Sequence, residues 1–156
     1  MGHATPQRKG HSMYGRLALM LVASFISMYI LMYAMVDTFK DAIPNLNQGY
    51  MAAIMTAPMG ILELLLMSKM YPDKSKNLIF AALSVALFAI GWWGMRSQAA
   101  IGDQQFLKSM IPHHSGALLM CKNAKLRNDE TKALCDQIVK AQIEEIAQMR
   151  AMLGKS

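Results

Sequence analysis

The chain has 156 residues, of which 54% are hydrophobic and only 17% are charged, and 16 of them are methionine. The apolar residues gather in three long blocks, which excludes an ordinary water-soluble globule. The net charge of +6 comes without the basic and aromatic pattern of nucleic-acid-binding proteins, and two cysteines are too few for a disulfide-rich scaffold, so both classes are excluded.

The three apolar blocks predict membrane-spanning helices over residues 17–36, 50–68 and 78–95. Each block is close to the ~20 residues that cross a hydrocarbon core. The first block is too long for the apolar part of a signal peptide, so it is predicted to be a retained span. Aromatic residues at the span ends, such as Trp92 and Trp93, suit a membrane interface. The sequence therefore predicts a transmembrane domain over residues 17–95 after a tail at residues 1–16.

The basic residues predict the orientation of these spans. Three lie before the first span and three follow the second: Arg8, Lys9, Arg16, Lys69, Lys74 and Lys76. The opposite side has only Lys40 and Arg96 close to the spans. Because cytoplasmic loops carry the excess of lysine and arginine, the N-terminal tail is predicted to be cytoplasmic and everything after Met95 to lie outside. We expect a multi-pass protein of a bacterial plasma (inner) membrane with a periplasmic or extracellular C-terminal part.

The chain after Gly102 has the pattern of a helical hairpin, predicted over residues 103–153. Spacings of three and four predict one inward stripe on each helix. The first stripe is Phe106, Met110, His113, Ala117, Met120 and Ala124, and the second is Cys135, Ile138, Gln142, Glu145, Met149 and Met152. Asp103 is the predicted N-cap of the first helix, Pro112 is expected to disturb that helix, and Asn128 is predicted to form the hairpin tip and the second N-cap.

The hairpin also has the densest group of side chains that could bind a metal ion. The predicted primary ligands are Met110, His113, His114 and Met120, and the secondary ligands are Cys121, Cys135 and Met149. Thioether, imidazole and thiol groups together favour Cu(I), Cu(II) or Ag(I), whereas the closely spaced Cys and His ligands of a zinc site are missing. The alternative is that the methionines fill a core. The adjacent histidines favour metal, because imidazole is a common ligand and an uncommon core residue.

Cys121 and Cys135 are equally far from residue 128, so a hairpin would bring them to the same level. In an oxidising compartment this pair is expected to form a disulfide that stabilises the small hairpin. The alternative is that both cysteines stay reduced and supply thiolates to a Cu(I) site.

The run from Asp103 to Met120, with its Met-x-x-His-His motif at residues 110–114, resembles the bacterial family called domain of unknown function 305. The later cysteines and the stretch 142–149 extend this resemblance to residue 153, and residues 32–37, 45–51 and 58–59 resemble the membrane extension of some members. The resemblance implies a ferritin-like fold and, because secreted members are associated with copper binding, copper handling. Many relatives carry two hairpins, whereas this chain has one, so we expect the hairpin to pair with a second copy or lie on its own membrane domain.

Methionines also follow one face of each of the first two spans. A transmembrane metal route would use Met28, Met32, Met35, Met51, Met55, Met59, Glu63 and Met67. Flexible packing between helices explains the methionines equally well. Glu63 is harder to explain by packing, because a carboxyl group within a bilayer is costly and is usually functional.

The predicted fold class is all-α: three transmembrane helices followed by a ferritin-like two-helix hairpin. The predicted function is membrane-anchored binding of copper, or of silver, for metal tolerance or delivery. The alternatives are a small Cu(I) transporter and a structural or partner-binding membrane protein without metal. The expected partners are the lipid bilayer, the metal ion and a second copy of the chain, and no organic cofactor is expected. We expect no enzyme, because the chain has no Glu-x-x-His pair, phosphate loop or catalytic triad.

Overall fold

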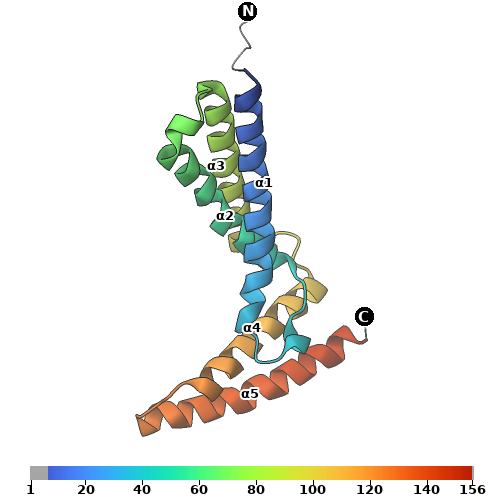
Figure 1. Cartoon of the computed structure of the whole chain (residues 1–156). Coiled ribbons are helices and arrows are strands. Elements are labelled where there is room, and N and C mark those ends of the chain that lie inside the picture. The colour runs from blue at the N-terminus through green and yellow to red at the C-terminus, as the bar shows by residue number, and fades with distance from the viewer. Residues whose placement is uncertain (1–6, 156) are drawn as a thin grey trace, which may run out of the picture. The chain divides into compact units, whose positions relative to one another are not determined.

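The computed structural model describes residues 7–155, and these form helices joined by short connections (Figure 1). The long helices are α1 (Gln7–Leu31), α2 (Leu46–Leu66), α3 (Lys74–Ser97), α4 (Asp103–Asn123) and α5 (Asp129–Leu153). Short 3-10 helices η1 (Met32–Met35), η2 (Phe39–Asp41) and η3 (Ser68–Met70) lie between them. No strand occurs among residues 7–155, so the predicted all-α fold class is confirmed.

The chain divides into two compact units. The first runs up to Ile30 and includes Gly49–Ala99, so it holds nearly all of α1, α2 and α3. The second comprises Leu31–Gln48 together with residues 100–155, and it holds α4 and α5. Residues 31–48, which the sequence predicts to be the end of the first span and the link after it, thus belong with the hairpin.

Three segments of the described chain are long and apolar enough to cross a membrane: Met13–Met35, Leu46–Leu66 and Lys74–Ser97. They correspond to the three predicted spans with shifts of a few residues at their ends. Of the predicted tail at residues 1–16, residues 1–6 lie outside the described residues, and α1 already begins at Gln7. The helix therefore starts well before the apolar block that it carries.

Small residues let α2 and α3 approach closely within the first unit. A Cβ atom added at Gly94 would lie 2.6 Å from Cε1 of Tyr50, and one added at Gly60 would lie 2.5 Å from Oγ of Ser84. The Tyr50 ring cannot easily move away, because its hydroxyl donates to the carbonyl of Ala99 at 2.7 Å. Glycine at this seam replaces the larger side chains that would hold the two helices apart.

An aromatic cluster joins the three helices at one end of the first unit. The buried rings of Tyr14 and Tyr71 lie with their centroids 5.4 Å apart. The Tyr14 hydroxyl donates to Oδ1 of Asn77 at 2.7 Å, and the Tyr71 hydroxyl donates to Oε1 of Glu63 at 3.1 Å. Burial and the neighbouring Glu63 carboxylate raise the pKa of Tyr71. Glu63 thus lies in the last turn of α2 with a hydrogen-bond donor beside it.

In the second unit α4 and α5 form the predicted hairpin, shown in yellow-orange and red in Figure 1. Its core consists of Ile111 and Leu118 from α4 and Ile146 and Met149 from α5. Asn128 caps α5 as predicted, since its side chain accepts a hydrogen bond from the Thr131 amide at 2.9 Å.

One local prediction about the first hairpin helix needs correction. Gly102, not Asp103, is the N-cap of α4, and Asp103 is its first helical residue. The Asp103 carboxylate there still suits the positive end of the helix dipole. Pro112 does not end the helix, which continues through it to Asn123.

The inward stripe that we predicted on the first hairpin helix is wrong. Phe106 and Met120 are 50% and 58% exposed, and His113 is exposed too, whereas Ile111 and Ser115 are fully buried. The reason is that α4 is covered on the other side by residues 31–48. Spacing identifies a face of a helix but not what covers it. The second predicted stripe is partly correct, because Met149 is buried while Met152 is 51% exposed.

The buried carboxylate of Asp41 joins residues 31–48 to both hairpin helices. Its Oδ2 atom accepts from the Ser115 hydroxyl of α4 at 2.6 Å and from the Thr38 hydroxyl at 3.0 Å. Its Oδ1 atom accepts from Nη2 of Arg150 on α5 at 2.6 Å, and the same nitrogen donates to the carbonyl of Lys40 at 2.7 Å. Ser115 in turn accepts from the Asp37 amide at 2.8 Å. One side chain therefore binds three separate segments of the unit.

These contacts also set the charge state of Asp41. Burial raises the pKa of this carboxyl group, but the hydrogen bonds from Ser115, Arg150 and Thr38 and the charge of Arg150 outweigh burial, so the pKa lies below its ordinary value. A carboxyl group whose pKa falls on folding stabilises the folded state above its unfolded pKa, near ~3.9. That stabilisation is lost as the pH falls through the lower folded value.

Replacing Asp41 should destabilise the second unit. We expect Asp41→Asn to lower the free energy of unfolding by about 1–3 kcal/mol at pH 7, because it removes charged hydrogen bonds and leaves Arg150 without its counter-ion. Thermal unfolding in detergent would measure the loss, which should shrink as the pH falls below the unfolded pKa of ~3.9 and disappear below the lower pKa of the folded state. Asp129→Asn is the matched control, since that exposed carboxylate pairs with the exposed Lys132 next to it on α5. Equal stability of the two variants would contradict the role of Asp41.

The glycine seam of the first unit can be tested in the same way. Gly94→Ala should destabilise the packing of α2 on α3 by about 1–3 kcal/mol, because the new methyl group overlaps the Tyr50 ring. Gly49→Ala, one residue from Tyr50, meets no atom within 4 Å and should be tolerated. Unfolding of both variants in detergent, followed by circular dichroism, would show the difference; a tolerated alanine at position 94 would count against the seam.

Candidate metal centre

Among the predicted ligands, His114 is the one whose two ring nitrogens both have a polar partner. It lies one turn after Met110 on α4, and its Nδ1 atom is 2.8 Å from the Met110 carbonyl oxygen. Its Nε2 atom is 2.7 Å from Oε2 of Glu145 on α5. The His114 side chain is largely buried, whereas that of Glu145 is half exposed. The structure therefore fixes the ring between an oxygen atom of its own helix and a carboxylate of the facing helix.

His113 lies next to this pair but points differently. Its ring centroid is 5.9 Å from that of His114, with the two rings nearly perpendicular. Unlike His114 it is exposed. Consecutive residues of a helix point about 100° apart, so only one of the two imidazoles can face the seam between α4 and α5. The pair thus offers one anchored imidazole and one in contact with solvent.

The three predicted thioether ligands lie in two environments. Met149 is buried in the hairpin core, and Met110 packs against that same core. Met120 lies on the exposed side of α4. Met110 precedes His114 by one helical turn on α4, and Met149 follows Glu145 by one turn on α5.

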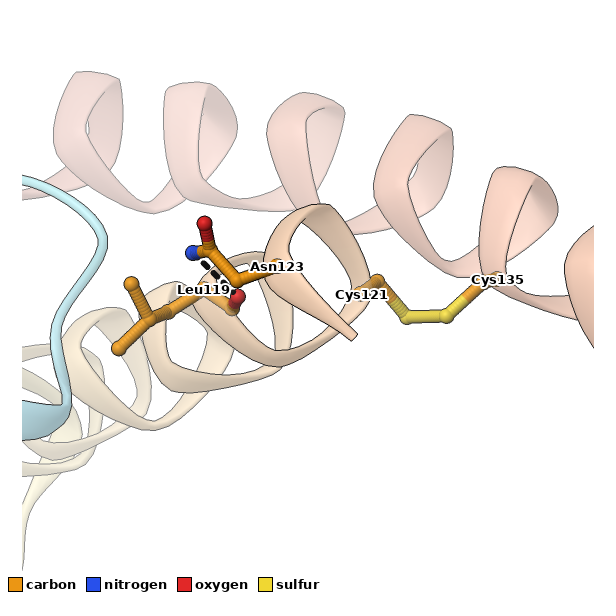
Figure 2. The surroundings of a disulfide bond; sticks show 4 residues. All are labelled: Leu119, Cys121, Asn123 and Cys135. Atoms are coloured by element: carbon orange, nitrogen blue, oxygen red, sulfur yellow. Dashed lines mark hydrogen bonds between the residues drawn. A yellow bond between two sulfur atoms is a disulfide. The ribbon is translucent and has the colours of Figure 1, made fainter. Parts of the chain in front are cut away.

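Cys121 and Cys135 are joined by a disulfide with a Cα–Cα distance of 5.4 Å (Figure 2). Figure 2 shows the bond crossing from the last turn of α4 to the first turns of α5, near Asn123, whose side chain donates to the Leu119 carbonyl at 2.9 Å. In this form neither sulfur is a thiolate, so the two cysteines are not available as metal ligands. Closing a loop of 14 residues stabilises the hairpin by roughly 3 kcal/mol in the chain-entropy description.

The residues of the predicted transmembrane route fall in both units. Met32 and Met35 belong to the second unit, and Met28 with the residues from Met51 onwards belongs to the first. The buried side of α2 consists mainly of small residues, namely Ala52, Ala53, Thr56, Ala57 and Gly60, with Leu64. Met55 and Met67 are exposed, and Met51 and Met59 are half-buried. The closest packing in this unit thus involves small side chains rather than thioethers.

Among residues 7–155 no group of three or more His, Cys, Asp or Glu side chains is arranged to hold a metal ion. The arrangement around His114 instead provides one imidazole nitrogen and one carboxylate oxygen, with thioethers and a second imidazole close by. Such a mixed donor set suits copper better than the harder ions, which prefer oxygen alone.

The sequence interpretation did not identify Asp41, Ser115 and Arg150 as a group, nor Glu145 as the partner of His114. Asp41 and Arg150 are 109 positions apart, and no local pattern connects them. One signal was present: residues 37–48 are rich in Asp, Asn and Gln, which is unusual for a simple link between two spans. For Glu145 the signal was its level in the hairpin, close to that of His114.

The chain resembles known proteins over most of its length. Residues 95–153 match the family described as domain of unknown function DUF305. The uncharacterized protein L153 of Acanthamoeba polyphaga mimivirus is 30% identical over 142 residues, which cover 89% of this chain and 91% of that protein. This similarity extends beyond the hairpin into the apolar helices. No solved structure matches the chain. The chain therefore belongs to the DUF305 family.

Proposed function

We propose that the hairpin binds a copper ion next to His114 and that the three apolar helices anchor it in a membrane, for metal tolerance or delivery. The orientation of His114 is the observation that carries this proposal. An imidazole that ligates a metal usually has its other ring nitrogen bonded to a carbonyl or carboxylate, which fixes the ring. The Met110 carbonyl oxygen, 2.8 Å from Nδ1, is in that position and leaves Nε2 as the ligating atom.

The carboxylate of Glu145 fits the second coordination position. Two ligands bound at right angles to one ion, each at about 2.0 Å, lie about 2.8 Å apart. Nε2 of His114 and Oε2 of Glu145 are 2.7 Å apart. The same distance also suits a direct hydrogen bond, so a proton and a metal ion would compete for this gap.

The remaining donors follow from what surrounds the pair. His113 offers a solvent-facing imidazole, and Met110 and Met149 offer thioethers that bind soft ions. Silver shares the preference for thioethers and is the competing ion. The disulfide removes Cys121 and Cys135 from the ligand set, so the proposal rests on nitrogen, oxygen and thioether donors.

The division of the chain into units supports a location of the hairpin outside the cytoplasm. Residues 36–45 and 100–155 lie outside the three apolar segments and belong to one compact unit, so we place them on the same side of any membrane that the three helices cross. Lysine and arginine are concentrated at the other ends of these helices, which favours the cytoplasm for those ends. A disulfide also persists more readily in an oxidising compartment.

Copper titration of the purified protein in detergent tests this function. Substituting both histidines by alanine, His113→Ala with His114→Ala, should weaken Cu(II) binding by at least about tenfold, because the imidazole ligands are lost. Glu145→Gln should weaken it less and alter the Cu(II) electron paramagnetic resonance spectrum while leaving its nitrogen couplings in place.

In the control variant both cysteines are replaced by serine. This variant should bind as many copper ions per chain as the wild type, measured at a temperature where the variant remains folded. Copper binding by the histidine variant that equals the wild type would refute the site. Copper flux into liposomes through the purified protein alone, abolished by Glu63→Gln, would show transport instead of binding at the hairpin.

A further inference from the structure

One side of the hairpin exposes an apolar surface that no part of the second unit covers. We define the outer face as Phe106, His113, Ala117 and Met120 on α4 and Leu134, Ile138, Ala141, Glu145 and Met152 on α5. Phe106, Met120, Leu134 and Met152 are 50%, 58%, 55% and 51% exposed. Ala117 and Ile138 are half-buried between the helices and solvent.

Helical geometry places these residues on the side away from residues 31–48. Ser115 and Arg150 face those residues, since both bind Asp41. On each helix the outer face follows spacings of three, four or seven, which keep it on one side. Ser115 on α4 and Arg150 on α5 lie on the side of the hairpin that faces residues 31–48. The outer face lies on the opposite side of the hairpin.

The two halves of the outer face are in register. His114 contacts Glu145, and Cys121 is bonded to Cys135, which fixes the levels of the two helices. Between these contacts Ala117 of α4 lies at the level of Ala141 of α5. The same register places His113 of α4 at the level of Glu145 of α5. The face therefore has small residues near its middle and larger ones toward both ends.

The exposed area is large for a unit of this size. Its four large apolar side chains alone expose on the order of 400 Å², which is at the scale of the largest apolar patches on monomeric proteins. The other residues of the face add to this area, and each partner in a standard interface contributes ~800 Å². A surface of this kind is usually covered by another protein surface.

We propose that the outer face docks on the same face of a second copy of this chain, with α4 of each copy lying on α5 of the other. Two features favour a second copy. Small residues at the centre of both halves allow the two copies to approach closely. At the level of position 113, an imidazole on α4 of one copy meets a carboxylate on α5 of the other. In a two-fold pair that keeps the levels, His113 faces the partner's Glu145 and Ala117 faces the partner's Ala141. Confinement of both copies to one membrane raises their effective concentration.

This pairing requires no metal, so it is tested on protein prepared with a chelator. One tagged copy carries Ala117→Cys and a differently tagged copy carries Ala141→Cys, with the native disulfide intact in both. A short bismaleimide added to membranes that contain both copies should join the two tags. In the control, the second copy carries Ala147→Cys instead of Ala141→Cys. Ala147 is also exposed but lies on a different side of α5. The yield of the cross-linked product should fall about tenfold, because the linker reaches only neighbouring thiols.

A second measurement separates docking from folding. Ala117→Arg places a charge at the centre of the face and should convert the protein in detergent from dimer to monomer, while Ala147→Arg should leave the dimer unchanged; both should retain the helical circular dichroism of the wild type. A monomeric wild type, equal cross-linking at positions 141 and 147, or a product that joins the face only to another protein would overturn the proposal. Loss of copper binding in the histidine variants would affect none of these outcomes.

Discussion

The second unit of this protein depends on one buried carboxylate. Asp41 accepts hydrogen bonds from Thr38, from Ser115 on α4 and from Arg150 on α5. An ionised group in a site that is only 6% exposed is unfavourable unless each oxygen atom is bonded and a counter-ion is close, and both conditions are met here. These bonds decide which side of the hairpin is covered. Residues 31–48 occupy the side of Ser115, and the side of Phe106 and Met120 remains open.

The sequence predicts features that depend on neighbouring residues. The apolar blocks gave the three long helices, because spanning length and hydropathy are local properties, and Asn128 gave the start of α5, because a cap acts within one turn. The features that it missed depend on distant residues. The stripe from Phe106 to Met120 has the spacing of a packed helix, but the contacts of Ser115 with residues 31–48 bury the neighbouring side instead. Spacing alone could not distinguish the two sides of α4.

The candidate metal site shows the same limit. The Met-x-x-His-His motif identified His114, but the motif does not reveal that Nε2 meets Glu145 across the hairpin, 31 positions later. Of the predicted donors, Met149 lies in the hairpin core, Met120 faces outward and the cysteines bond to each other. Residue type alone could not reveal that Cys121 and Cys135 are used by a covalent bond.

The contact between Asp41 and Arg150 also sets the order in which the chain can assemble. These residues are 109 positions apart, and Arg150 comes after all three apolar helices. A ribosome makes residues 31–48 early and makes their partner on α5 after all of the apolar helices. Until then the Asp41 carboxylate lacks its bond to Arg150. The second unit can close fully only when the last turns of α5 have emerged, so its folding follows the synthesis of the apolar helices.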